Sequence, residues 1–220
     1  MAARVAPMTK GDRLVRGALV VGMVGFAGFM APAMCLYPGG TWWDSTTQGY
    51  RFWENFLCDL EWRVALNGQP NEGASHLAQT AMLILAIALL PFWLAVTQLF
   101  DRRRLAVMVR SLGLASVVGT IAVVLMPSDR FGVLHGIAVV VAGLPGLSAA
   151  GLAIAGLFLG EPRPRIAAWT GTSMLVYAVA DFALYVSHLI AHTEGTWLTA
   201  AVQKIALLLL LAWMIVVAGR

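Results

Sequence analysis

Six long apolar segments constrain this chain more than any other feature of its sequence. Each is long enough for an α-helix to cross the roughly 30 Å hydrocarbon core of a bilayer. With 60% hydrophobic and 12% charged residues, the composition departs from that of a soluble globular domain. We therefore predict an all-α fold, a bundle of six transmembrane helices forming a single integral membrane domain over residues 1–220. The predicted spans are 17–38, 75–99, 106–126, 131–159, 166–191 and 197–218.

The basic residues predict the orientation of this bundle. Of the 15 Lys and Arg residues, 11 lie near span ends that an alternating topology places on one side, together with both chain termini. Loops rich in Lys and Arg stay in the cytoplasm, so both termini are predicted to be cytoplasmic and the protein to be a multi-pass protein of the cell (inner) membrane. An even number of spans places both termini on the same side of the membrane, which agrees with this orientation. The net charge of +4 therefore indicates topology, and nucleic-acid binding is not indicated.

One long loop, residues 39–74, lies on the opposite, extracytoplasmic side. It is rich in tryptophan, and part of it predicts an interfacial amphipathic helix over residues 48–66. The apolar residues that recur at helical spacing are Trp53, Leu57, Leu60 and Val64. Cys35 and Cys58 also lie on this side, where they form either a disulfide in an oxidising compartment or two ordinary thiols.

All four histidines lie at or near span ends on that same side, at positions His76, His135, His188 and His192. His188 and His192 follow Asp181 and Tyr185 along one stripe of the fifth span. Because isolated polar groups are costly in lipid, such a one-sided cluster suggests a site. Three histidines with an open fourth position suit catalytic zinc, and we predict His135, His188 and His192 as ligands, with His76 as a substitute. The alternative is that the His188 and His192 side chains contact water and head groups at the interface.

Acids and a lysine complete the candidate site. Asp129 or Asp181 is the predicted general base, and Lys204 would steady developing negative charge. For Asp129 the alternative is a turn in which Ser128 also takes part. For Asp181 and Lys204 the alternative is a buried ion pair that pins two adjacent helices.

Three functions remain open at this point. The sharpest is a zinc-dependent hydrolase of a lipid amide or ester, with its histidine and aspartate pocket on the extracytoplasmic side. A second is a non-enzymatic subunit or assembly factor whose partners are other proteins of a larger membrane complex. A third is a redox protein with haem or another cofactor held between histidines at matched depth. The lipid bilayer is the one partner common to all three.

Two resemblances bear on these predictions. Residues 52–61 (FWENFLCDLE) resemble the outer-loop signature of an uncharacterised bacterial six-helix membrane family, which carries the string Asn-x-x-Ser-Asp-Leu-Gly. Here Cys58 stands for the Ser and Glu61 for the Gly. This resemblance implies the six-span architecture, and the family is known only as a domain of unknown function.

The second resemblance is to the superfamily of alkaline ceramidases and adiponectin receptors. Those membrane hydrolases hold zinc with a Ser, an Asp and three His, two of them in an HxxxH pair. The matching residues occur here in the same order, as Ser128, Asp129, His135, His188 and His192. The chain departs in having six spans and in carrying HxxxH on the penultimate one. The resemblance implies zinc and a lipid substrate.

Overall fold

The computed structural model describes residues 9–160, 164–191 and 197–220, and these fold as an all-helical bundle. Six helices are long and apolar enough to span a membrane, which confirms the predicted fold class. They are α1 (Lys10–Leu36), α2 (Glu72–Thr97), α3 (Arg103–Leu125), α5 (Val133–Leu159), α6 (Arg165–Ala191) and α7 (Trp197–Ala218). Two short elements, η1 (Cys58–Glu61) and α4 (Ser128–Phe131), lie between them.

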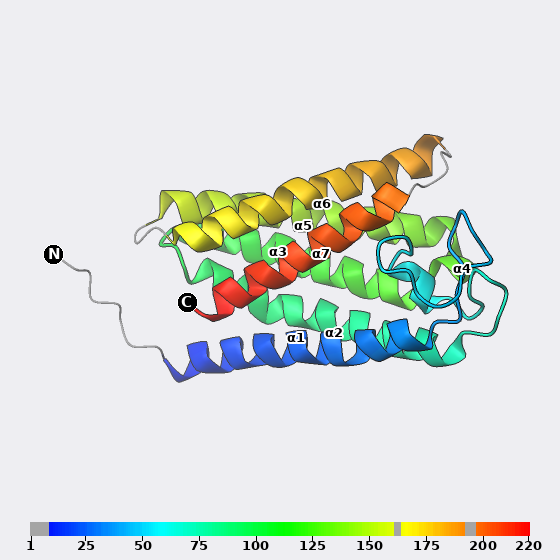
Figure 1. Ribbon diagram of the computed structural model, residues 1–220. Coiled ribbons are helices and arrows are strands. Elements are labelled where there is room, and N and C mark those ends of the chain that lie inside the picture. Colours follow the sequence, from blue (N-terminus) through cyan, green and yellow to red (C-terminus); the bar gives the residue numbers. More distant parts are fainter. Residues whose placement is uncertain (1–8, 161–163, 192–196) are drawn as a thin grey trace.

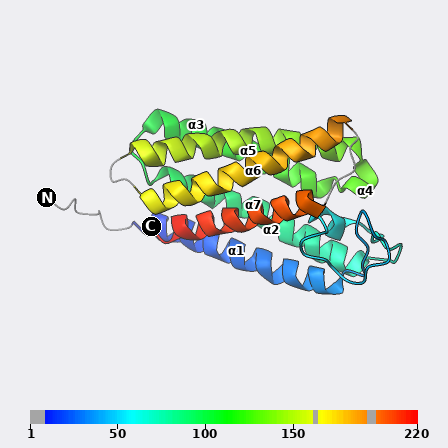
Figure 2. The ribbon, with the colours of Figure 1, turned by 45° about the horizontal axis from the view of Figure 1, so that its top comes forward.

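The long helices pack as three antiparallel pairs that are joined side by side. α1 packs mainly on α2, α3 on α5, and α6 on α7, while α2 with α3 and α5 with α6 link the pairs (Figures 1 and 2). The starts of α1 and α3 and the end of α7 lie together at one end, here called the arginine end (Figure 1). Residues 37–71, here called the cap, and α4 lie at the opposite end, the cap end (Figure 1).

The first helix begins earlier than predicted because its start is capped. The backbone N–H of Asp12 donates to the Thr9 hydroxyl at 3.2 Å, and the N–H of Thr9 donates to the Asp12 carboxylate at 3.0 Å. This reciprocal pair of bonds satisfies N–H groups that a helix otherwise leaves open. The polar turn at residues 10–16 is therefore helical, although it is outside the apolar run.

The predicted amphipathic helix over residues 48–66 is wrong. The structure has only the one-turn η1 there, flanked by turns and by isolated bridges between Gly39 and Gln48 and between Val64 and Pro70. Asn55 accepts a hydrogen bond from the Arg51 backbone N–H at 2.9 Å, and Asp59 accepts one from Phe56 N–H at 2.8 Å. Such local bonds from side chain to backbone compete with the helical pattern, so the apolar periodicity did not produce a helix.

Close contact between α3 and α5 depends on Gly119. A Cβ at this position would lie 2.6 Å from the Cα of Ala142, a backbone atom that cannot rotate away. We expect Gly119→Ala to lower the free energy of unfolding by about 1–3 kcal/mol, the usual cost of overpacking. Thermal unfolding of the detergent-purified protein measures this change.

Gly28→Ala is the matched control for that substitution. A Cβ at Gly28, within α1, meets nothing within 4 Å. Because alanine is the better helix former, this variant should be as stable as the native protein or slightly more stable. Equal behaviour of the two variants would contradict the close packing of α3 on α5.

Candidate functional site

Asp59 is the centre of the folded cap. Only 2% of its surface is exposed, and its carboxylate accepts three hydrogen bonds. The donors are Trp42 Nε1 at 3.0 Å, Asn55 Nδ2 at 3.2 Å and the Phe56 backbone N–H at 2.8 Å. Asn55 also donates to the carbonyl of Gly40 at 2.7 Å, so the two side chains together join three separate parts of the cap. These contacts give the irregular loop a fixed shape.

Lys204 of α7 attaches this cap to the bundle. Its side chain is fully buried, and Nζ donates to the carbonyl oxygen of Asn55 at 2.6 Å. Nζ also lies 5.6 Å and 5.8 Å from the ring centroids of Tyr50 and Phe52, within the range of cation–π attraction. The neighbouring Gln203 accepts a hydrogen bond from the Leu57 N–H at 2.9 Å. Two consecutive polar residues on a mostly apolar helix therefore bind the cap.

The predicted ion pair between Asp181 and Lys204 does not form as a direct contact. Within the described ranges, the one ion pair closer than 4.0 Å joins Asp129 to Arg130. Asp181 and Lys204 interact electrostatically over a longer distance, and Asp59 is the other acid that interacts with the lysine. When the cap folds, the backbone carbonyl of Asn55 lies against Nζ of Lys204. The sequence had suggested Asp181 as the partner in that position.

Burial changes the acid–base behaviour of the cap. It raises the pKa of Asp59 to about 6, although the hydrogen bonds from Trp42, Asn55 and Phe56 and the charge of Lys204 act in the opposite direction. Burial, together with the neighbouring Asp129, raises the pKa of Glu61 to about 8. Glu61 is 1% exposed, and its Oε2 has no hydrogen-bond partner among the residues that the structure describes. Glu61 is therefore mostly protonated at neutral pH.

We expect the protein to lose stability as the pH rises towards 8. The pKa of Glu61 is about 8 in the folded protein and 4.5 for an ordinary glutamate, so the folded state binds this proton more tightly. Between these two pH values the free energy of unfolding falls with rising pH, because a buried charge without a partner must form. The loss expected between pH 6 and pH 9 is about 1–3 kcal/mol. Thermal unfolding at the two pH values measures it.

Glu61→Gln is the control that isolates this effect. The amide keeps the size of the side chain and removes its titration, so the variant should lose much less stability over the same pH range. An identical pH dependence in the native protein and in Glu61→Gln would assign the effect to other groups, of which Asp59 is the first to test.

The polar residues Asp181, Tyr185 and His188 form a stripe along α6, and Asp181 of this stripe lies close enough to Lys204 to interact with it electrostatically. Asp181 and Tyr185 are half-buried, and His188 is exposed. Tyr185 faces α5, since a Cβ built on Gly136 would lie 3.5 Å from its hydroxyl. Asp181 makes no hydrogen bond within the part of the chain that the structure describes. Of the six spans, α6 has the smallest buried share, so this stripe lies on the least covered span.

The residues around α4 hold the cap in place. Ser128 accepts a hydrogen bond from Trp62 Nε1 at 2.8 Å, and Asp129 accepts one from the Arg63 backbone N–H at 3.2 Å. His135 is buried, and its Nδ1 lies 2.7 Å from the carbonyl oxygen of Met126. Because a carbonyl only accepts, Nδ1 carries the proton and satisfies a carbonyl group at the end of α3. These positions support the turn interpretation of Ser128 and Asp129.

The four predicted metal ligands are not gathered by the described part of the chain. His76 is exposed in the first turns of α2, and His135 is turned to Met126. Among residues 9–160, 164–191 and 197–220, no group of three His, Cys, Asp or Glu side chains has an arrangement that could hold a metal ion. His192 lies outside the described residues, so the pairing of His188 with His192 stays a prediction.

The two cysteines are free thiols, which decides between the two alternatives left open. Cys35 is exposed at the end of α1, and Cys58 is partly buried in η1. Burial, with the nearby carboxylates of Glu61 and Asp59, raises the pKa of the Cys58 thiol. Cys58 is therefore an unreactive thiol as long as the cap stays folded.

Sequence reasoning missed Asn55 and Asp59 as partners of Lys204, and the bond between Gln203 and the Leu57 N–H. Two features of the sequence could have indicated these contacts. One is the spacing of Asn55 and Asp59 around a turn, and the other is the pair of adjacent polar residues Gln203 and Lys204 on the last span. Both cap residues lie within the helix predicted over residues 48–66 but outside its apolar stripe, whereas in the structure they are 0% and 2% exposed.

No protein-family model, no curated protein and no solved structure matches the chain.

Proposed function

We propose that this integral membrane protein binds an acyl lipid at its cap end and hydrolyses its amide or ester linkage, with Asp181 as the acid–base group. The observation that carries the proposal is the half-buried Asp181, which makes no hydrogen bond within the described residues and lies on the least covered span. A polar group at such a place in lipid is costly unless it serves a ligand.

The depth of Asp181 favours the linkage region of a lipid. Asp181 lies ten residues from the end of α6, about 15 Å at 1.5 Å per residue. A helix of 27 residues is about 40 Å long and exceeds the roughly 30 Å hydrocarbon core, so Asp181 lies about 10 Å inside that core. The amide and ester carbonyls of a lipid lie at the boundary of this core, about 10 Å from Asp181 along the membrane normal, and are the lipid polar groups nearest to it.

The other candidate catalytic residues fit structural roles better. Asp129 is already bound to the Arg63 N–H and to Arg130, so we place the base at Asp181. Lys204 is bound to Asn55 and lies against two rings, which favours a role in closing the cap. Tyr185, next to Asp181 on the stripe, is the neighbouring group with a hydroxyl to orient a carbonyl.

Photo-crosslinking tests the proposal. The native protein in vesicles would be exposed to ceramide and to phosphatidylethanolamine, each with a photoreactive group next to the acyl carbonyl, and fatty-acid release would be followed in parallel. We expect crosslinks in α6 peptides, and loss of both crosslinks and release in Asp181→Asn. Ser187→Ala is the matched control, since Ser187 lies on the same helix and its hydroxyl bonds to the Leu184 carbonyl. A native protein without crosslinks in α6 would overturn the proposal.

Zinc belongs to this proposal as the metal-dependent form of the hydrolase. It would be held by His188 and His192 together with a further ligand. Elemental analysis of the purified protein beside a His188→Ala/His192→Ala variant tests it. One zinc per chain that is lost in the variant would support the metal-dependent form. Iron with a visible haem spectrum would favour the redox alternative.

One observation favours a second candidate, a subunit of a larger membrane complex. The face of α6 that is least covered in the single chain is also the surface a partner helix would cover. Crosslinks from α6 to another protein, with none to either lipid, would select this candidate.

A further inference from the structure

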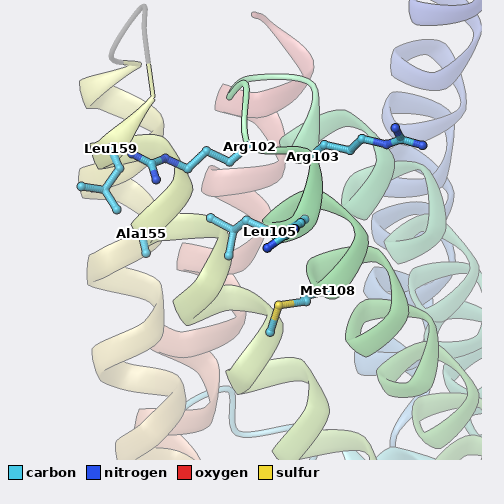
Figure 3. Close-up of a pocket in the computed structure, with 7 residues that line it drawn as sticks. Arg102, Arg103, Leu105, Met108, Ala155 and Leu159 are labelled. Carbon is cyan, nitrogen blue, oxygen red and sulfur yellow. The ribbon is translucent and has the colours of Figure 1, made fainter.

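Two hollows lie next to each other at the arginine end, far from the cap. The larger has a volume of about 570 Å³ and lies between the start of α3 and the end of α5. Its lining combines Arg102, Arg103 and Arg104 with apolar side chains, among them Met108 of α3 and Leu159 of α5 (Figure 3). The second hollow, of about 480 Å³, shares Arg103, Arg104 and Met108 with the first.

The arginines lack acidic partners. Within the described residues none of the three takes part in an ion pair, and the first turn of α3 holds no acidic residue. Asp101 is the one neighbouring acid along the described chain, so the group keeps a net positive charge. Figure 3 shows the side chain of Arg102 extended towards Leu159, while Arg103 extends to the opposite side of α3. The guanidinium groups of Arg102 and Arg103 therefore lie on opposite flanks of α3, although both residues line the hollow.

The floor of the hollow is apolar and open to the bilayer. Met108 is 51% exposed and lies more than one turn inside α3, and Leu159 is 59% exposed at the last residue of α5. Cationic groups at the interface directly above exposed apolar side chains match an amphiphile with an anionic head. Planar guanidinium groups bind phosphate oxygens through two parallel hydrogen bonds, which a lipid phosphate offers. A soluble phosphate would use the charges and leave the apolar floor uncovered.

We propose that this hollow binds an anionic phospholipid from the leaflet at the arginine end. The phosphate lies beside Arg102, where Arg103 and Arg104 add positive charge at the rim of the hollow, and the acyl chains lie along Met108 and Leu159. The site is separate from the proposed catalytic site, and it stands whether or not the protein is a hydrolase.

Lipid retention measured by native mass spectrometry tests this site. The full-length protein would be purified after equilibration in vesicles of phosphatidylglycerol and phosphatidylcholine at equal amounts. We expect selective retention of phosphatidylglycerol by the native protein. Each arginine near the surface strengthens such binding roughly five-fold, so Arg102→Gln should weaken retention by about that factor and the triple Gln variant by much more. The triple Lys variant keeps the charge and should retain more lipid than the triple Gln variant.

The control removes the same charge at the same end of the bundle. Lys10, Arg13 and Arg165 are exposed there and lie outside the hollow. Their triple Gln variant should retain phosphatidylglycerol as the native protein does. Equal losses in the two triple Gln variants would reduce the effect to general surface charge and overturn the proposal. Displacement of the lipid by millimolar inorganic phosphate would also overturn it, because the apolar floor would then contribute nothing.

Discussion

Lys204→Ala is expected to lower the free energy of unfolding by about 3–5 kcal/mol, the cost of removing one partner from a buried charged arrangement. The lysine is fully buried, and its loss leaves the Asn55 carbonyl with the longer hydrogen bond from the Tyr50 hydroxyl, at 3.4 Å, and Asp59 without its nearby positive charge. The cap would then separate from α7. Thermal unfolding of the detergent-purified protein measures the loss of stability.

Thiol labelling reports the cap itself. In a Cys35→Ser background, Cys58 is the one remaining cysteine, and it is partly buried in η1. We expect slow labelling by a maleimide in the otherwise native protein and rapid labelling in Lys204→Ala. Lys204→Met restores most of the lost volume without the charge, so its effect should fall between the two. Unchanged labelling in both variants would contradict the role of Lys204 as the anchor of the cap.

Asp59→Ala is the substitution with the second largest expected effect, a loss of about 2–4 kcal/mol. It removes the acceptor of three hydrogen bonds, from Trp42, Asn55 and the Phe56 N–H. Hydrogen bonds to a charged group contribute about 1.5–3 kcal/mol each, and the donors left in the cap lose their partners, although the loop relaxes in part. Thermal unfolding and labelling of Cys58 provide the measurements.

Asp44→Ala is the matched control. Asp44 belongs to the same loop and accepts hydrogen bonds from Thr46, but it is exposed. An exposed turn residue of this kind usually changes stability by less than about 1 kcal/mol. If both aspartates had equal effects, Asp59 would be one turn residue among several.

A double-mutant cycle relates the two predictions. Asp59 and Lys204 interact electrostatically and both contact Asn55. Their substitutions should therefore be less than additive, with a coupling of about 0.5–3 kcal/mol. Strict additivity would mean that the two side chains stabilise separate parts of the structure.

The number of spans and their limits followed from the sequence with few errors. Runs of apolar residues must form helices in lipid, since each backbone N–H and C=O needs an internal partner there. The sixth span, residues 197–218, agrees with α7 at both ends. The first helix starts seven residues before the predicted start of the first span, because a capping box at Thr9 and Asp12 extends the helix beyond the apolar run.

The cap shows where the same reasoning failed. Spacing of Trp53, Leu57, Leu60 and Val64 indicated a helix, yet Leu57 and Leu60 are buried while Trp53 and Val64 are exposed. The conformation depends on the hydrogen bonds of Asn55 with the backbone of Gly40 and Arg51, and on those that the Asp59 carboxylate accepts from Trp42, Asn55 and the Phe56 N–H. No periodicity encodes such bonds, because their partners come together only when the loop folds against α7.

The sequence by itself determined the class of protein, the six spans and the polar residues that are costly to bury. These follow from local composition, since the exclusion of polar groups from lipid acts on each segment separately. The tertiary structure alone decided which polar residues meet. It turned Lys204 to Asn55 and Asp59, turned His135 to Met126 and left Asp181 half-buried on α6, because helix rotation and the path of an irregular loop depend on contacts between distant segments.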